Sequence, residues 1–364
     1  MSVGTFPFAE IQRLVADGAI RSDAGIAGEQ VQPSSIDLTL GAEAYRMPGS
    51  VLPLAGERVR DLIDALALDR LDLSQPACLA RGQVYLIRLR ECLSLPEGVE
   101  AYTNSKSSTG RIDLATRVVA DGSPRYDRLP SGYTGDLWLE VIPRSFDVVA
   151  GVGDSLNQAI LFHDREVLDQ HQLRQLHATE ALLYEPDGTP VDGERCVFDG
   201  RVLMTAHLGT DVVGYVAVRS HRPVVLSRIK AHRPEDYFAR IDRPHSGYLY
   251  LQKDSFYILA TYEGVRVPPG YACEMVPYDA TAGEFRAHYA GFFDPGWGVR
   301  SSGVQGARAV LEVRPHEDDL ILRHRQPICA MAYERLSSDC DRLYGTTGNN
   351  YAAQDGPRLS KHFS

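Results

Sequence analysis

Two basic side chains enclose a run of hydroxyl groups in residues 104–111, which read Asn-Ser-Lys-Ser-Ser-Thr-Gly-Arg. Lys106 and Arg111 supply positive charge there, and Ser107 and Ser108 supply O–H donors. Hydroxyl groups, backbone N–H groups and cations are the groups that hold phosphate oxygens in proteins. We therefore expect a polyphosphate-binding loop, although the spacing is not that of a Walker loop. The competing interpretation is a solvated Ser/Thr turn.

A second segment, 288–298, combines aromatic residues with a turn and an acid, in the order His-Tyr-Ala-Gly-Phe-Phe-Asp-Pro-Gly-Trp-Gly. Asp-Pro-Gly-Trp is typical of a tight turn, and the aromatic run before it indicates a hairpin. Ala290 is small, and Asp294 can hydrogen-bond the edge of a flat heterocycle that stacks on Trp297. The competing interpretation is an ordinary hairpin whose aromatic residues belong to a core.

Two glutamates, Glu140 and Glu312, each lie in a Leu-Glu-Val triplet within an apolar strand. Partial burial raises the pKa of a carboxyl group towards the range in which it can act as a general base. The His-x-Glu and Pro-Cys-x-x-Cys patterns of zinc deaminases do not occur in the sequence. We therefore expect no protein-bound metal and a carboxylate mechanism. In the alternative, each glutamate is a structural residue that faces solvent or pairs with an arginine.

The elements that must position these residues are mainly strands. Residues 83–90, 136–141 and 256–260 are rich in β-branched and aromatic residues and are bounded by turn residues, which predicts strands. Helical patterns are sparse and occur at 7–16 and 164–180. A mostly β architecture with a few short helices follows.

The sequence also contains an internal repeat, in which equivalent residues are separated by 172 positions. The matched residues are Tyr85, Glu91, Pro96, Gly98, Glu140 and Pro143 in the first copy and Tyr257, Glu263, Pro268, Gly270, Glu312 and Pro315 in the second. A period of this length suits two copies of a whole domain rather than a solenoid. We expect a first domain over 1–185, a second over 186–344, and a mobile C-terminal tail over 345–364.

Composition restricts the class of protein further. The 364 residues are 44% hydrophobic and 24% charged, with 38 Lys plus Arg against 48 Asp plus Glu and a formal net charge of −10. A protein that coats DNA or an anionic membrane through bulk charge would be basic. Six scattered cysteines without a Cys-x-x-Cys pair indicate reduced thiols. We expect a cytoplasmic globular protein that binds neither nucleic acid nor membrane.

Together these segments resemble the dCTP deaminase branch of the trimeric dUTPase superfamily, in its double-length form. The resemblance covers most of the chain and includes residues 33–41, the Lys-Ser-Ser loop with Arg111, the hairpin and both Leu-Glu-Val strands. Residues 351–356, Tyr-Ala-Ala-Gln-Asp-Gly, are similar to the family segment that closes over bound nucleotide. The resemblance implies two tandem dUTPase-like domains of β-clip or jelly-roll type and a homo-oligomer.

The same resemblance implies hydrolytic deamination of dCTP to dUTP and ammonia, in the supply of dUMP and dTTP. Ser107 and Arg111 would orient the water or the catalytic glutamate, and Mg²⁺ would arrive on the triphosphate without a protein cage. The residues that it assigns to the phosphates, the base and the closing segment are Lys106, Ser108, Ala290, Asp294, Trp297, Tyr351 and Gln354.

The two halves have diverged in complementary ways. Where the first has Lys-Ser-Ser at 106–108, the second has Tyr-Asp-Ala at 278–280. Glu140 follows residues 131–135 at a spacing that resembles the family's, whereas Glu312 follows the fuller hairpin with residues 299–308 inserted. We favour Glu312 as the base and keep Glu140 as the alternative.

Three other functions remain open from the sequence. A dUTPase would cleave the α–β phosphate bond with a carboxylate-activated water, and a bifunctional enzyme would deaminate dCTP and then remove pyrophosphate. A non-catalytic nucleotide-binding regulatory module would use both glutamates structurally. The sequence also leaves open whether dTTP acts as a regulator.

Overall fold

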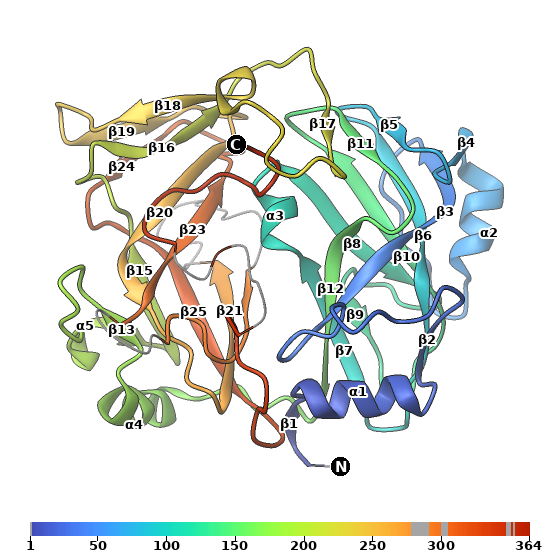
Figure 1. The fold of residues 1–364 in the computed structure, drawn as a ribbon, viewed down its shortest axis with the longest axis horizontal. Coiled ribbons are helices and arrows are strands. Elements are labelled where there is room, and N and C mark those ends of the chain that lie inside the picture. Colours follow the sequence, from blue (N-terminus) through green and yellow to red (C-terminus); the bar gives the residue numbers. More distant parts are fainter. Residues whose placement is uncertain (1, 278–290, 300–304, 347–350, 352–353) are drawn as a thin grey trace. The chain divides into compact units, whose positions relative to one another are not determined.

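The computed structural model describes residues 2–277, 291–299, 305–346, 351 and 354–364 (Figure 1). The chain divides into two compact units. The first comprises Met1–Asp164, Arg219–Asp236 and Ser360–Ser364, and the second comprises Arg165–Val218 and Tyr237–Leu359. The first unit thus ends before the boundary expected at residue 185, and it includes two segments from later in the chain.

The described part of the first unit is a β structure with three short α-helices and one 3-10 helix at Pro234–Asp236. Its α-helices are α1 (Phe8–Ala16), α2 (Val59–Leu66) and α3 (Ser107–Gly110). Its strands are β1 (Gly4–Thr5), β2 (Ile20–Ser22), β3 (Ile36–Met47), β4 (Asp69–Asp72), β5 (Ala77–Leu79), β6 (Val84–Ser94), β7 (Glu100–Ser105), β8 (Leu114–Ala120), β9 (Arg128–Leu129), β10 (Thr134–Pro143), β11 (Val148–Ala150), β12 (Ser155–His163) and β17 (Val224–Val225). A ten-stranded sheet runs in the order β8-β10-β6-β3-β12-β7-β9, with β1, β2 and β4 on its flanks, and β17-β11-β5 form a second sheet.

The second unit has the same character. Its helices are α4 (Gln170–Glu180) and α5 (Gly193–Cys196). Its strands are β13 (Leu183–Tyr184), β14 (Val197–Phe198), β15 (Arg201–Thr205), β16 (Val212–Ala217), β18 (Phe238–Asp242), β19 (Tyr248–Leu251), β20 (Tyr257–Val265), β21 (Tyr271–Pro277), β22 (Phe292–Phe293), β23 (Ala307–Val313), β24 (Leu320–Arg323) and β25 (Pro327–Arg335). The sheets are β13-β20-β16-β18 with β23 paired to β20, β14-β15-β25-β21-β22, and β19-β24.

The expected strands and the first helix are confirmed, because the predicted runs lie in β6, β10, β20 and α1. The second helix begins later than expected, at Gln170. Asp169 caps it there by accepting a hydrogen bond from the backbone N–H of Gln172, whose side chain accepts one from the backbone N–H of Asp169. This capping box fixes the first turn and ends the preceding extended segment.

The internal repeat is confirmed in strand register. Glu140 of β10 lies opposite Leu86 of β6, and Glu312 of β23 lies opposite Ile258 of β20. Both members of the second pair are 172 positions after their counterparts. The two Leu-Glu-Val strands therefore occupy the same place in two copies of one sheet.

A buried hydrogen-bond pair repeats as well. The backbone N–H and hydroxyl of Thr39 donate to the carboxylate of Glu91 at 2.8 and 2.6 Å. The corresponding groups of Thr205 donate to Glu263 at 2.8 and 2.7 Å. Both glutamates are almost fully buried, so in each unit the threonine supplies hydrogen bonds that offset the cost of burying the carboxylate. The shared scaffold is thus maintained by polar as well as apolar contacts.

The end of the chain differs from the mobile tail expected over 345–364. Ser360, His362 and Phe363 are buried, and Phe363 forms a parallel bridge with His232. Composition suggested mobility because the segment is polar and rich in glycine. Backbone pairing and one buried ring nevertheless hold the last five residues in the first unit.

No helix in the described part of the chain has the length and apolar character needed to cross a membrane.

Candidate active site

The expected phosphate loop is a single helical turn at the end of β7. Lys106 precedes α3, and its backbone N–H donates to the carbonyl of Leu156 at 3.0 Å. Just before it, the hydroxyl of Ser105 lies 2.7 Å from that of Thr116 on β8. These contacts tie the start of the turn to strands on both sides, so the turn has a fixed position on the sheet.

The four expected residues of this loop differ in exposure. Ser107 is exposed and Lys106 is partly exposed, whereas Ser108 and Arg111 are buried. The backbone N–H of Arg111 donates to the carbonyl of Ser107 at 3.1 Å, which closes the turn. The turn is therefore only partly exposed to solvent. Phosphate binding by its two serines and two cations stays a prediction.

The side chain of Lys106 is paired with an acidic residue in this structure. Its ammonium group forms an ion pair with the carboxylate of Asp37, whose side chain is 12% exposed. A phosphate that binds to Lys106 must compete with this carboxylate. Asp37 is a residue that the motif analysis missed, because it lies on β3 and far from the loop in sequence.

Glu140 takes part in a second ion pair. Arg117 of β8 donates to Oε1 through Nε at 3.0 Å and through Nη2, and the hydroxyl of Tyr126 donates to Oε2 at 3.2 Å. The Arg117 guanidinium stacks on the Tyr126 ring, 4.0 Å from its centroid, and also donates to Ser50. Glu140 is 1% exposed. The alternative in which this glutamate pairs with an arginine describes it correctly.

The Glu140 ion pair and the phosphate loop also use different faces of the sheet. Successive residues of a strand point to opposite faces, and Arg117 follows Thr116 directly. Because Thr116 contacts Ser105 beside the loop, the Arg117–Glu140 pair lies on the other face of β8. The structure therefore does not bring Glu140 to the phosphate loop within the first unit.

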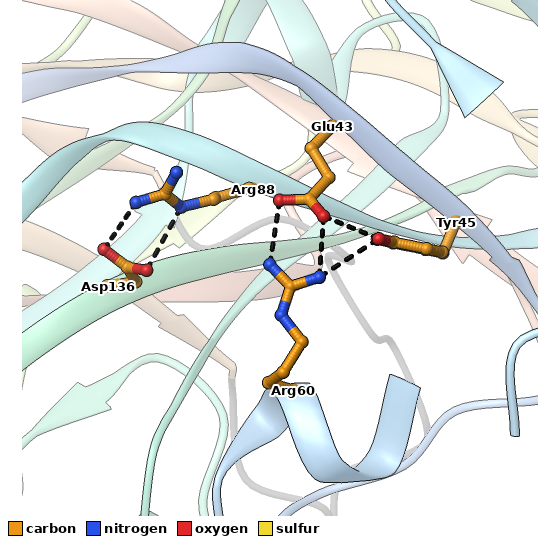
Figure 2. Close-up of polar contacts among 5 residues, drawn as sticks. All are labelled: Glu43, Tyr45, Arg60, Arg88 and Asp136. Atoms are coloured by element: carbon orange, nitrogen blue, oxygen red, sulfur yellow. Dashed lines mark hydrogen bonds and ion pairs between the residues drawn. The ribbon is translucent and has the colours of Figure 1, made fainter. Parts of the chain in front are cut away.

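Further charged side chains lie on the face with Glu140, and Figure 2 shows them. Arg60 of α2 donates to both oxygens of Glu43 at 2.6 and 2.8 Å, and the Tyr45 hydroxyl donates to Glu43 at 2.5 Å. Arg88 and Asp136 form another two-point pair at 3.1 and 2.8 Å. The Arg60 guanidinium lowers the pKa of Glu43 to about 2, mainly through these hydrogen bonds. These pairs were not predicted, because their members come from separate segments.

The Arg60–Glu43 pair fastens α2 to the sheet. Val59 and Ile63 of α2 pack with Met47, Leu86, Val119 and Trp138, and the Arg60 guanidinium lies 4.8 Å from the centroid of the Trp138 ring. Glu43 and Arg88 also line a half-open pocket of about 240 Å³, together with Ser22, Gly41 and Arg90. Both of these charges are therefore paired within the first unit.

In the second unit the expected Asp-Pro-Gly-Trp turn is present. The backbone N–H of Trp297 donates to the carbonyl of Asp294 at 3.1 Å, and Gly296 has a φ of +90°. Proline followed by a glycine with positive φ is the type II arrangement. A side chain at Gly296 would also meet Leu343 and Tyr344 at 2.9 and 3.1 Å, so the turn requires glycine for two reasons.

Trp297 belongs to the core of this unit. Its ring lies 5.0 Å from that of Phe293, at 85°, and 4.8 Å from that of Tyr344. The residue is 6% exposed. In this structure the hairpin therefore carries aromatic core residues, as the competing interpretation expected. Stacking of a base on Trp297 stays a prediction. Ala290 lies outside the described residues, and Asp294 is buried at the start of the turn.

The residues expected to close over nucleotide pack on β23. Gln354 is 1% exposed and donates through Nε2 to the carbonyl of Arg308 at 2.6 Å. The Arg308 guanidinium lies 3.2 Å from Asp355, and Tyr351 is buried in the core with Trp297. Closure over a nucleotide stays a prediction.

Glu312 lies on the same strand as this contact. Side chains four positions apart share a face, about 13 Å apart along a strand, so Arg308 and Glu312 point the same way. Glu312 is 6% exposed. Glu312, Gln354 and Tyr351 thus belong to the second unit, where Gln354 contacts the strand of Glu312 at Arg308, whereas Lys106, Ser107, Ser108 and Arg111 lie at α3 in the first unit.

Comparison with known proteins covers almost the whole chain. A family model described as the 2'-deoxycytidine 5'-triphosphate deaminase N-terminal domain matches residues 2–165, and the model of the C-terminal domain matches residues 169–363. Among solved structures, the crystal structure of 2'-deoxycytidine 5'-triphosphate deaminase from Agrobacterium tumefaciens is 38% identical, with a TM-score of 0.87. The match covers 95% of this chain and 99% of that chain.

Proposed function

The chain belongs to the 2'-deoxycytidine 5'-triphosphate deaminase family, and from this premise we propose that it hydrolyses dCTP to dUTP and ammonia. The observation that carries the proposal is the turn at α3, where a lysine and hydroxyl groups are held in a fixed position on the sheet. Such a turn suits a triphosphate, and the substrate would be dCTP with Mg²⁺ on its phosphates.

Glu312 is the proposed general base. It would take a proton from water and pass it to N3, while the water oxygen attacks C4 of the cytosine ring. It would then transfer the remaining proton of the C4 hydroxyl group to the amino group, so that ammonia leaves and the C4 carbonyl of uracil forms. This choice is supported by the state of Glu140, whose two oxygens are occupied by Arg117 and Tyr126.

Lys106 and Ser108 are proposed to bind the phosphates, and Ser107 and Arg111 to orient water or the base. In the second unit, Asp294 would contact the edge of the cytosine. If these assignments are correct, Lys106→Ala and Asp294→Ala each abolish turnover. Circular dichroism melting checks that each variant is folded, and full turnover in either folded variant contradicts its assigned role.

The decisive experiment incubates the purified protein with dCTP and, separately, with dUTP, each with Mg²⁺, and measures ammonia, dUTP and pyrophosphate. Ammonia and dUTP in equal amounts support the proposal. Pyrophosphate in addition identifies a bifunctional enzyme, whereas pyrophosphate from dUTP without ammonia from dCTP identifies a dUTPase. Nucleotide binding without any product identifies a regulatory module and overturns the proposal.

A further inference from the structure

The last five residues form a segment that we call the C-terminal clasp, Ser360–Ser364, and it docks on the connector Arg219–Asp236. Both segments belong to the first unit. The connector is itself fixed to a sheet of that unit, because its strand β17 pairs in parallel with β11. The clasp therefore docks on a part of the chain that the first unit already holds in place.

Backbone hydrogen bonds hold the clasp on the connector. The N–H of Lys230 donates to the carbonyl of Lys361 at 3.0 Å, and the N–H of Ser364 donates back to the carbonyl of His232 at 3.0 Å. Neither bond uses the hydroxyl of Ser360. A substitution that removes only this hydroxyl should therefore leave the clasp docked.

The hydroxyl of Ser360 contacts the proposed phosphate loop instead. It donates to the backbone carbonyl of Ser108 at 2.7 Å, and both residues are buried. Figure 1 shows the chain end, marked C, near α3. The end of the chain is therefore bonded directly to the loop, although the two residues are 252 positions apart in sequence.

The Ser108 carbonyl needs this donor because α3 is only one turn long. In a continuing α-helix, the N–H of Ile112 would donate to the carbonyl of Ser108. Here it donates to the carbonyl of Thr109 at 3.2 Å. The last carbonyls of a helix have no partner within the helix, and a buried carbonyl that loses its donor is strongly unfavourable. Ser360 thus closes the phosphate loop from outside the motif.

We propose that Ser360 is a positioning residue, which holds Ser108 and the turn around it in the conformation that binds phosphate. A loop that is already ordered loses less conformational freedom when its ligand binds, so the affinity is higher. Without the Ser360 hydroxyl, part of the binding free energy would be used to order the loop. This inference rests on the proposed function, because it takes Ser108 as a phosphate ligand.

The test is Ser360→Ala in the full chain, with two measurements. The affinity for inorganic triphosphate with Mg²⁺, measured by calorimetry, should fall about three- to tenfold, the range that corresponds to one hydrogen bond. The KM for dCTP should rise by a similar factor with kcat unchanged, because Ser108 is assigned to the phosphates and not to the proton transfers. Ser360→Thr keeps the hydroxyl and should restore most of the affinity.

Ser364→Ala is the matched control, because it also removes one serine hydroxyl from the clasp. That hydroxyl donates to the carbonyl of His232 at 3.3 Å and not to the loop, so its loss should leave the triphosphate affinity unchanged. Thermal melting checks that both variants are folded. If Ser360→Ala does not fold, Ser360→Cys takes its place, since a thiol is a weak donor. An equal loss of affinity in the Ser364 and Ser360 variants overturns the role of Ser360.

Calorimetry separates this inference from the proposed function, because binding of triphosphate does not require deamination. If dCTP yields no ammonia but Ser360→Ala still weakens triphosphate binding, the proposed reaction alone is overturned. Equal triphosphate affinities in the wild type and Ser360→Ala overturn this inference alone. A wild-type protein that binds no triphosphate overturns both.

Discussion

The two units keep one scaffold and use its surface differently. In the first, the sheet face around Glu140 is closed by α2 and by arginine–carboxylate pairs. In the second, the position of Arg88 is taken by Ala260 and that of Asp136 by Arg308, which binds Asp355 of the C-terminal region. The Thr–Glu hydrogen bonds and strand register are common to both. The two copies thus share the contacts that define the sheet, but they carry different residues on its face.

This comparison is tested most strongly by the two glutamates. Glu312→Gln should lower kcat by about 10² to 10⁴, the range typical of a lost general base, with little change in melting temperature. Steady-state deamination of dCTP and thermal melting of the same sample check both parts. Turnover close to wild type in this variant would return the role of base to Glu140.

Glu140→Gln should chiefly affect stability. The neutral amide removes the charge that balances Arg117, which keeps its hydrogen bond to Ser50 and its stacking on Tyr126. Loss of one partner of a buried pair costs about 3–5 kcal/mol, and we expect about 2–3 kcal/mol because the Arg117 side chain is 36% exposed. Urea unfolding measures this change. A Glu140→Gln protein that is stable but has lost turnover would contradict the structural role of Glu140.

How far the sequence predicted these features depended on whether they were local. The turn at 294–297 and the α3 loop were predictable because backbone preferences act over a few residues. The repeat was predictable because matched residues share one offset. The partners of the charged groups were not predictable: Asp37 for Lys106 and Arg117 for Glu140 come from other strands, and only the sheet register brings them together. The buried end of the chain was missed for the same reason.

In the first unit, the ion pair of Glu43 makes the free energy of unfolding depend on pH. The pKa of Glu43 is lowered to about 2 by Arg60, whereas an unfolded glutamate titrates near 4.3. Its contribution is therefore complete above about pH 4.5 and is lost as the pH falls towards 2. Arg60→Met should remove about 2 kcal/mol of stability at pH 7, after allowance for solvent screening, and less at pH 3. Urea unfolding at both values measures this, and an equal loss at both would refute the role of the ion pair.

His207 gives the smallest expected effect, and it belongs to the second unit. Burial is the main reason that its pKa is lowered to about 4, and its ring packs against Tyr262 and His324, 5.2 and 5.6 Å away. Because the unfolded chain takes up the proton first, this histidine lowers stability as the pH falls from about 6.5 towards 4. In His207→Gln the decrease in stability between pH 7 and pH 5 should be smaller than in the wild type by about 1–2 kcal/mol. Comparing this difference, rather than the stability at one pH, separates titration from the lost ring contacts, which act equally at both values.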